Sequence, residues 1–150
     1  MKVADLMNPA PASVPLDATF GAAFQILRDS RATSLPVVDA AGIYKGIFDL
    51  KDVWDVLLPK AAQLHRKSIE NLAFVSTSVD KMKEQLALAA SRPVTDFLTA
   101  EDAPPLHPDS PLLQAILLFD QYGESIAVVD RGTKKLVGAI ASWQILDALR

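Results

Sequence analysis

Hydrophobic positions recur in the same order twice along the chain, with about 91 residues between the two copies. The pentapeptide VADLM at residues 3–7 corresponds to VTDFL at residues 94–98. In each copy apolar residues then follow at positions i, i+3, i+4 and i+7, which form one face of an α-helix. The two stripes are Phe20, Ala23, Phe24 and Leu27 in the first copy and Leu112, Ala115, Ile116 and Phe119 in the second.

Cap residues precede both predicted helices. Asp17 or Thr19 can accept hydrogen bonds from the free N–H groups of the first turn in copy one, and Ser110 can do so in copy two. Pro111 suits the first helical position, where no N–H group is needed. These start signals strengthen the prediction of one amphipathic helix per copy.

A pair of strands and a closing helix follow in each copy. The runs LPVVD at 35–39 and IAVVD at 126–130 are rich in β-branched residues, and each is followed by a turn and a second apolar run around a glycine. The closing helical stripes are Val53, Val56 and Leu57 in copy one and Ile145, Ala148 and Leu149 in copy two. The repeating unit is therefore an extended lead-in, a helix, two strands and a second helix.

The pattern divides the chain into repeat one at 1–58, an insert at 59–91 and repeat two at 92–150. Apolar stripes in the insert predict a helical hairpin or one bent helix, with Ser78 as a candidate cap. One helical stripe is Ala61, Leu64, Ile69 and Leu72, and the other is Val79, Met82, Leu86 and Ala90. We expect the two repeats to pack about a pseudo-twofold axis as one α+β module with two equivalent clefts.

Composition narrows the function. The 150 residues include no cysteine and carry a net charge of −3, so thiol chemistry is excluded and no basic excess indicates nucleic-acid binding. The richest apolar run, 112–119, is short and contains Gln114. We therefore expect no membrane span, no export signal and a cytoplasmic location.

The second copy's helix is apolar on more than its core stripe. Leu113, Leu117 and Leu118 add to that stripe, which predicts a second buried face. The favoured interpretation is a homodimer that covers this face. The alternative is a helix buried on all sides within a single chain.

In this order, these segments resemble the CBS domain, a small regulatory unit named after cystathionine β-synthase that occurs in tandem pairs. The resemblance rests on VADLM, LPVVD and GIFDLKD in copy one and on VTDFL, IAVVD and GAIASWQ in copy two. It implies a β-α-β-β-α fold for each repeat, frequent pairing into dimers, and clefts that bind adenosine-containing ligands. The implied effectors are an adenine nucleotide, adenosine or S-adenosylmethionine, and no cofactor is required.

The family's ribose-binding pattern is a glycine, a Thr or Ser three residues later and an Asp six residues later. In copy one, Gly46 is followed by Asp49 and then by Asp52, which matches the family acid. In copy two, Gly138 is followed by Ala141 and Gln144, so both polar positions differ, although Ser142 lies one residue later. The resemblance thus assigns ribose binding to Asp52.

A purely structural interpretation exists for the same residues. Asp49 is a natural N-cap of the closing helix, which we favour, and Asp52 lies near the positive end of the helix dipole. Ser142 is a candidate cap in copy two. For Asp52 we favour ligand binding.

The basic residue that binds the ligand's phosphate in many family members is missing at the corresponding positions of this chain. Many family members have a His or Arg before the first strand of the pair, whereas this chain has Thr33 and Ser34 in copy one and Glu124 and Ser125 in copy two. Thr33 and Ser34 are equally well explained as turn residues. The resemblance adds three strand positions to the expected ligand site, namely Pro36, Phe48 and Ala127. A ligand with little negative charge, or no ligand, is therefore expected.

No catalytic or metal-binding constellation is visible. His65 and His107 lack ligand spacing, and no nucleophile has a nearby base. We expect a regulatory module, not an enzyme, that senses a small effector and acts on an unknown partner protein. The alternative is a constitutive dimerisation scaffold with empty clefts.

Overall fold

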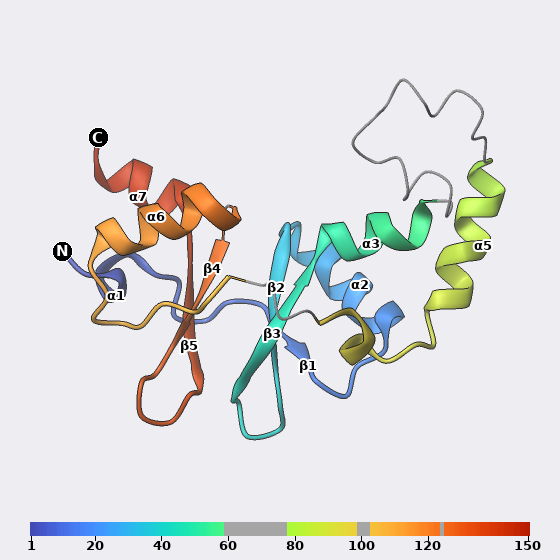
Figure 1. Ribbon diagram of the computed structural model, residues 1–150, viewed down its shortest axis with the longest axis horizontal. Helices are drawn as coiled ribbons and strands as arrows, with labels where there is room; N and C mark the ends of the chain where they lie inside the picture. Colours follow the sequence, from blue (N-terminus) through green and yellow to red (C-terminus); the bar gives the residue numbers. More distant parts are fainter. Residues whose placement is uncertain (59–77, 99–102, 124) are drawn as a thin grey trace.

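The computed structural model describes residues 1–58, 78–98, 103–123 and 125–150, which form two α+β units side by side (Figure 1). Repeat one contains β1 (Val14–Pro15), α2 (Phe20–Ser30), β2 (Ser34–Val38), β3 (Tyr44–Asp49) and α3 (Leu50–Leu57). Repeat two contains α6 (Leu112–Tyr122), β4 (Ser125–Val129), β5 (Leu136–Ala141) and α7 (Ser142–Ala148). The predicted order of helix, two strands and helix is confirmed in both.

The two sheets share one topology. In repeat one, β2 pairs antiparallel with β3, and β1 lies parallel to β2. In repeat two, β4 pairs antiparallel with β5, and Leu106 makes a parallel bridge to Val128 where repeat one has β1. Each hairpin is irregular at the equivalent point of its first strand, and the two equivalent glycines, Gly46 and Gly138, lie beside the irregularity.

These two glycines are needed for different reasons. Gly46 has a φ of 153°, a backbone conformation that residues with a Cβ rarely adopt. A Cβ at Gly138 would lie 2.7 Å from Met7 Sδ and 2.8 Å from the Asn8 carbonyl oxygen. Gly138 therefore lets the N-terminal segment approach β5 closely.

The lead-in segments are exchanged between the repeats. Helix α1 (Val3–Leu6) packs on repeat two, where Val3 is buried, while the 3₁₀ helix η2 (Val94–Phe97) packs on repeat one, where Val94 is buried. The backbone repeats this reciprocity, because Val3 N–H donates to Ser110 O and Val94 N–H donates to Ala18 O, each at 2.9 Å. Each repeat core thus contains a piece of the other copy's sequence.

The hairpin turns also join the repeats. Tyr44 N–H donates to Lys134 O at 3.1 Å, and Leu136 N–H donates to Gly42 O at 2.9 Å. These bonds connect the start of β3 to the start of β5, near the neighbouring hairpin turns in Figure 1. The reciprocal contacts have the form of a pseudo-twofold pair, as the duplicated sequence predicts.

Helix starts agree with the predicted caps only in part. Thr19 accepts from Ala22 N–H at 3.2 Å, which confirms it as the cap of α2. Ser110 instead accepts from His107 N–H at 3.0 Å, and Pro111 takes the N-cap position of α6. The prediction for Ser110 is therefore wrong, because its hydroxyl is used to close the preceding loop.

The predicted core stripes are confirmed in repeat one and half correct in repeat two. Phe20, Ala23, Leu27 and Val53 are buried as expected. In repeat two, Ala115 and Ile145 are buried, but Ile116 is 43% exposed and Leu149 is 66% exposed. Leu118 packs against the core instead of Ile116, because α6 is apolar around most of its circumference and the sheet contacts only one side of it.

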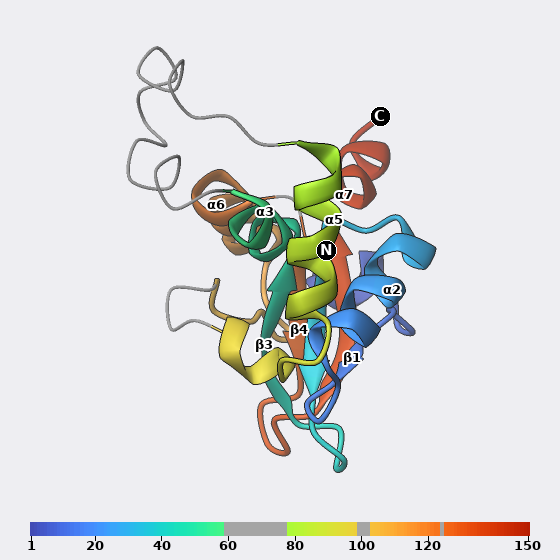
Figure 2. The same ribbon diagram turned by 90° about the vertical axis from the view of Figure 1, so that its right-hand side faces the viewer.

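The described part of the insert is helical. Helix α5 (Val79–Ala89) begins at Ser78, whose hydroxyl accepts from Lys81 N–H at 3.1 Å, as predicted. It lies on the outer side of repeat one against α2 and α3 (Figure 2). The other predicted helical stripe, 61–72, lies outside the described residues. Among the described helices, none has the length and apolar character needed to cross a membrane.

Candidate functional site

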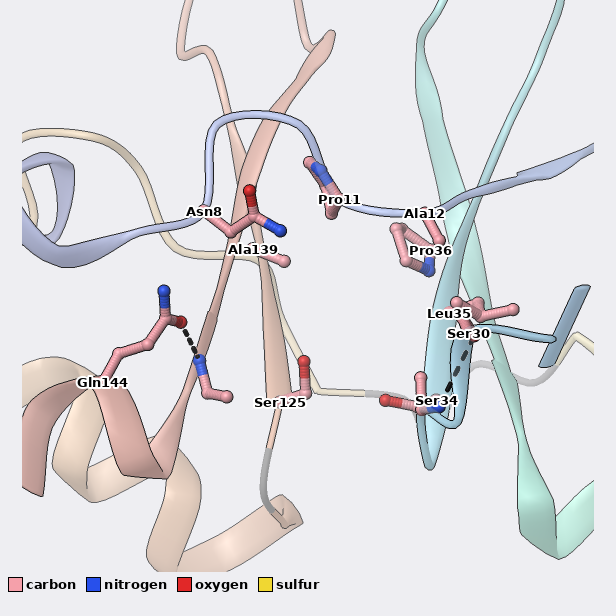
Figure 3. Close-up of a pocket in the computed structure, with 12 residues that line it drawn as sticks. Asn8, Pro11, Ala12, Ser30, Ser34, Leu35, Pro36, Ser125, Ala139 and Gln144 are labelled. Atoms are coloured by element: carbon pink, nitrogen blue, oxygen red, sulfur yellow. Dashed lines mark hydrogen bonds between the residues drawn. The ribbon is translucent and has the colours of Figure 1, made fainter. Parts of the chain in front are cut away.

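A cavity of about 230 Å³ lies between the two repeats (Figure 3). Three parts of the chain form its wall: the segment that crosses from α1 to β1, the first residues of β2 with the end of α2, and the strand ends of repeat two. The lining residues are Asn8, Pro11, Ala12, Ser30, Ala32, Ser34, Leu35, Pro36, Ser125, Ala139, Ala141 and Gln144. Both repeats therefore contribute to one site, as the two-cleft prediction requires.

Gln144 occupies the position of the family's ribose-binding acid in repeat two, and both ends of its amide are already bonded. Its Oε1 accepts from Ala141 N–H at 2.7 Å, and its Nε2 donates to Leu6 O at 2.9 Å. Ala141 has no polar side-chain atom to cap α7, so Gln144 satisfies the terminal N–H instead. Gln144 thereby ties the N-terminal lead-in to repeat two, and Ser142 is the first residue of α7, not its cap.

Three polar side chains of the cavity have hydrogen-bonding capacity to spare. Asn8 Oδ1 accepts from Ala10 N–H at 3.1 Å, whereas its Nδ2 has no partner among the described residues. The hydroxyls of Ser34 and Ser125 likewise make no hydrogen bond to the described residues, and Figure 3 shows both pointing into the space between the repeats. A ligand in this cavity can accept a hydrogen bond from Asn8 Nδ2 on the crossing segment. It can also bond to the hydroxyl of Ser34 on β2 and to that of Ser125 on β4.

Asp49, Asp52 and Thr33 lie together at the start of α3, outside this cavity. Asp49 caps α3 by accepting from Lys51 N–H at 2.8 Å, and Asp52 Oδ2 accepts from Asp49 N–H at 2.9 Å. The Thr33 carbonyl accepts from Leu50 N–H at 2.9 Å. By the pseudo-twofold relation this group corresponds to Ala141 and Gln144, and the second predicted cleft, the counterpart cleft, would lie beside it.

Of the three strand positions predicted to line the ligand site, only one lines the cavity. Pro36 lines the cavity, but Phe48 is fully buried in the core of repeat one, where its ring lies 5.7 Å from that of Phe20. Ala127 is only 4% exposed and Ser142 is not among the lining residues. The side chains of Phe48 and Ala127 are therefore packed in the interior and do not line this cavity, and Ser142, the first residue of α7, does not line it either.

Several lining residues were not predicted. Asn8, Pro11 and Ala12 come from the crossing segment, and Ala139 comes from the strand it pairs with. Their only signal in the sequence is the pair of prolines at 9 and 11, which indicates an extended segment without indicating where it lies.

Shifted ionisable groups lie at the opposite end of the β4–β5 hairpin. A hydrogen bond from Arg131 Nε, at 3.0 Å, lowers the pKa of Asp109. Backbone and hydroxyl hydrogen bonds from Thr133 lower the pKa of Asp130, which holds the turn. His107 Nδ1 lies 2.8 Å from Val129 O. No group of acidic and histidine side chains among the described residues is placed to hold a metal ion, and His65 lies outside them.

Comparison with known proteins agrees with this geometry. The CBS domain model matches the chain twice, at residues 3–53 and 94–150. A CBS domain-containing protein of unknown function from Kribbella flavida superposes with a TM-score of 0.73 at 24% identity, covering 99% of this chain and 98% of that one. CBSX2 from Arabidopsis thaliana gives 0.75 at 19% identity, covering 99% and 93%.

Two further solved structures add to this comparison. CBSX2 in complex with AMP gives a TM-score of 0.69 at 18% identity, covering 99% of this chain and 95% of that one. Protein MJ1004 from Methanocaldococcus jannaschii gives 0.70 at 20% identity, and the chain spans 59% of its length. No curated protein matches the chain.

The duplicated units, their exchanged lead-ins and the cavity between them define a tandem-repeat α+β module. Two family matches cover most of the chain, and each falls on one of the two repeats. The chain belongs to the CBS-domain family, as a tandem pair.

Proposed function

We propose that this chain is a regulatory CBS-pair module that binds a small adenosine-containing ligand between its repeats. The observation that carries the proposal is the cavity of about 230 Å³ to which both repeats contribute, with the polar groups of Asn8, Ser34 and Ser125 available to a ligand. The AMP complex of CBSX2, a protein of the same fold, supports an adenine-containing effector. We assign the module no catalytic step and no required cofactor, and we expect it in the cytoplasm.

Ligand binding would act by population shift. A ligand that contacts both repeats favours the arrangement in which they are correctly spaced, in proportion to its differential affinity for that arrangement. The backbone bonds between the hairpin turns, from Tyr44 to Lys134 and from Leu136 to Gly42, hold the repeats together at one end. Changes in the spacing between the repeats are then largest at the end opposite the hairpin turns, where the helices lie. A regulated partner protein that contacts these helices can respond to the change.

In the counterpart cleft, Asp52 is proposed to accept hydrogen bonds from ribose hydroxyls, with Thr33 beside it. A carboxylate suits this task because it offers several lone pairs to adjacent hydroxyls. Asp49 itself is assigned to the cap of α3.

The helices of repeat two support a homodimer. Among the described residues, most large apolar side chains that are exposed lie between 113 and 149. Leu113 and Leu117 on α6 and Trp143 and Leu146 on α7 are each more than half exposed. We define these four residues as the α6–α7 face and propose that a second copy of the chain covers it.

The test is thermal melting of the full chain with adenine, adenosine, AMP, S-adenosylmethionine and NAD. A ligand at 100 times its Kd stabilises by about 2.7 kcal/mol, which raises the Tm of a domain of this size by roughly 5 to 11 °C. The variant Asp52→Asn in the same assay reports whether the ligand uses the counterpart cleft. If none of the five compounds raises the Tm, the sensor function is rejected.

One observation favours a second candidate, a constitutive scaffold with empty clefts. Gln144, at the position of the family's acid, has both ends of its amide engaged within the chain. A module that had lost ligand binding would be free to use this position for structure. The melting experiment separates the two candidates, because a scaffold with empty clefts gives no ligand-dependent shift.

A further inference from the structure

The cavity described above differs from a nucleotide site in its charge. The described residues that line it are all Asn, Gln, Ser, Pro, Leu or Ala, so none of these described lining residues has an ionisable side chain. Resting on the proposed function, we infer that this cavity selects an uncharged purine base or nucleoside and discriminates against the same molecule once it is phosphorylated.

The engagement of Gln144 limits what the cavity can do with a ribose. Its Oε1 and Nε2 each already make one bond, to Ala141 and Leu6. A neutral amide in this state offers no charge-assisted acceptor to a pair of sugar hydroxyls. The ligand must therefore be recognised by polar groups of the cavity other than Gln144. These groups favour contacts to the base over contacts to the ribose.

The remaining polar groups suit a heterocycle. Asn8 Nδ2 is a donor without a partner among the described residues, and the Ser34 and Ser125 hydroxyls both donate and accept. Pro11 and Pro36 supply apolar wall from the crossing segment and from β2 (Figure 3). A planar base with ring acceptors and an exocyclic donor matches apolar walls with a few polar groups.

A phosphate, by contrast, meets no cationic side chain among the described residues that line the cavity. Desolvation of an anion is costly unless a cation or several donors replace its water. The last turn of α2 and the first turn of α7 both border the cavity through Ser30 and Gln144, so their dipoles oppose each other there. Arg31, which follows Ser30, is exposed, has a left-handed backbone (φ 57°) and is not a lining residue.

Volume supports the smaller ligand. Pockets for drug-sized molecules enclose roughly 300 to 1,000 Å³, and this cavity encloses about 230 Å³. A cavity of this size is better matched by a ligand smaller than a typical drug-sized molecule, such as a free base.

The experiment is a titration of the full chain, labelled with ¹⁵N, with adenosine and with AMP, followed by two-dimensional NMR. We expect adenosine to move the amide signals of Asn8, Ser34 and Ser125, and AMP to bind at these residues at least about tenfold more weakly. The variant Arg31→Ala should leave this ratio unchanged.

A gain-of-function pair strengthens the test. Ala32→Arg places a cation in the cavity wall and should raise the affinity for AMP about tenfold, the scale of one charge-assisted hydrogen bond, with little effect on adenosine. The matched control is Ala10→Arg, an exposed position outside the wall, which should change neither affinity.

The outcomes separate this inference from the proposed function. If AMP moves the signals of Asn8, Ser34 and Ser125 with an affinity equal to or higher than that of adenosine, the inference is rejected while the module remains a sensor. The inference is also rejected if adenosine moves only signals near Asp49 and Asp52. If neither ligand binds anywhere and melting is unaffected by all five compounds, the proposed function fails, and the inference fails with it.

Discussion

At the scale of single residues, Gln144 has a structural role at a position where the resemblance to the family predicts a ligand-binding acid. Gln144 lies six residues after Gly138, as Asp52 lies six residues after Gly46. In this chain the amide both closes the first turn of α7 and reaches Leu6, 138 residues away in the sequence. The sequence alone identifies Gln144 as a departure from the pattern. It does not reveal the bond to Leu6, because nothing local predicts that the N-terminal helix packs on repeat two.

We predict that Gln144→Ala lowers the free energy of unfolding by about 1 to 2 kcal/mol, because the Ala141 N–H and the Leu6 carbonyl both lose their partner. Gln144→Glu keeps an acceptor for Ala141 N–H but places a carboxylate against the Leu6 carbonyl. Its deficit should shrink as the pH falls toward about 4, where a glutamate side chain protonates and can donate. Urea unfolding at pH 7 and pH 4 measures both effects.

The control for these variants is Gln25→Ala. Gln25 donates to Asp29 at 2.9 Å on the exposed side of α2, so its loss should cost less than about 0.5 kcal/mol. Equal effects of the alanine substitutions at positions 25 and 144 would show that Gln144 does not tie the lead-in to repeat two.

At the scale of elements, the sequence predicts the order of the pieces but not which repeat each lead-in joins. The stripes that begin at Phe20 and Val53 are buried or packed against the core of repeat one, as predicted. Helix α6 is apolar on several sides, so its period alone cannot select the side that faces the sheet. The exchange of α1 and η2 depends on the folded arrangement of the two repeats, which a one-dimensional pattern does not contain.

Gly138→Ala tests the docking of the N-terminal segment on β5. The new Cβ would meet the Asn8 carbonyl oxygen, which is backbone and cannot move independently of the bonds between Asn8 and Ala139. We predict a loss of about 1 to 3 kcal/mol in the free energy of unfolding, which is typical of overpacking. Amide exchange at Asn8 should also accelerate, because the segment is displaced.

Gly132→Ala provides the matched control. Gly132 lies in the β4–β5 turn, and a Cβ there would approach only Asp130 Oδ2, at an ordinary distance of 3.5 Å. Its effect should be within about 0.5 kcal/mol. If Gly138→Ala is as well tolerated as this control, the close approach of the N-terminal segment is not what requires a glycine.

At the scale of the whole molecule, the two repeats are covered differently. Helix α5 lies against α2 and α3 of repeat one, and Ala89 at its end is buried in that core. No described element covers the corresponding helices of repeat two, where Leu113 is 68% and Trp143 69% exposed. The sequence predicts the surplus apolarity of α6 correctly. The alternative interpretation, a helix buried on all sides within one chain, is wrong.

This asymmetry allows a direct test of the proposed dimer. Leu117, 56% exposed, lies one helical turn after Leu113 on the α6–α7 face. In a symmetric dimer Leu117→Glu places a charge in the interface of both copies, and leaving a charge there without a partner costs about 2 to 5 kcal/mol. The dimer dissociation constant should therefore rise at least about thirtyfold in analytical ultracentrifugation. The free energy of unfolding of the monomer should change little, because the side chain is exposed in the single chain.

Leu88→Glu is the control for this substitution. Leu88 is 66% exposed on α5, far from the α6–α7 face along the chain and on the other repeat, and it makes the same change from leucine to glutamate. Its sedimentation should match that of the unsubstituted chain. If the Leu117 variant remains folded and dimeric while the Leu88 variant dissociates, the two copies meet through α5, and the exposed apolar side chains of repeat two have another role.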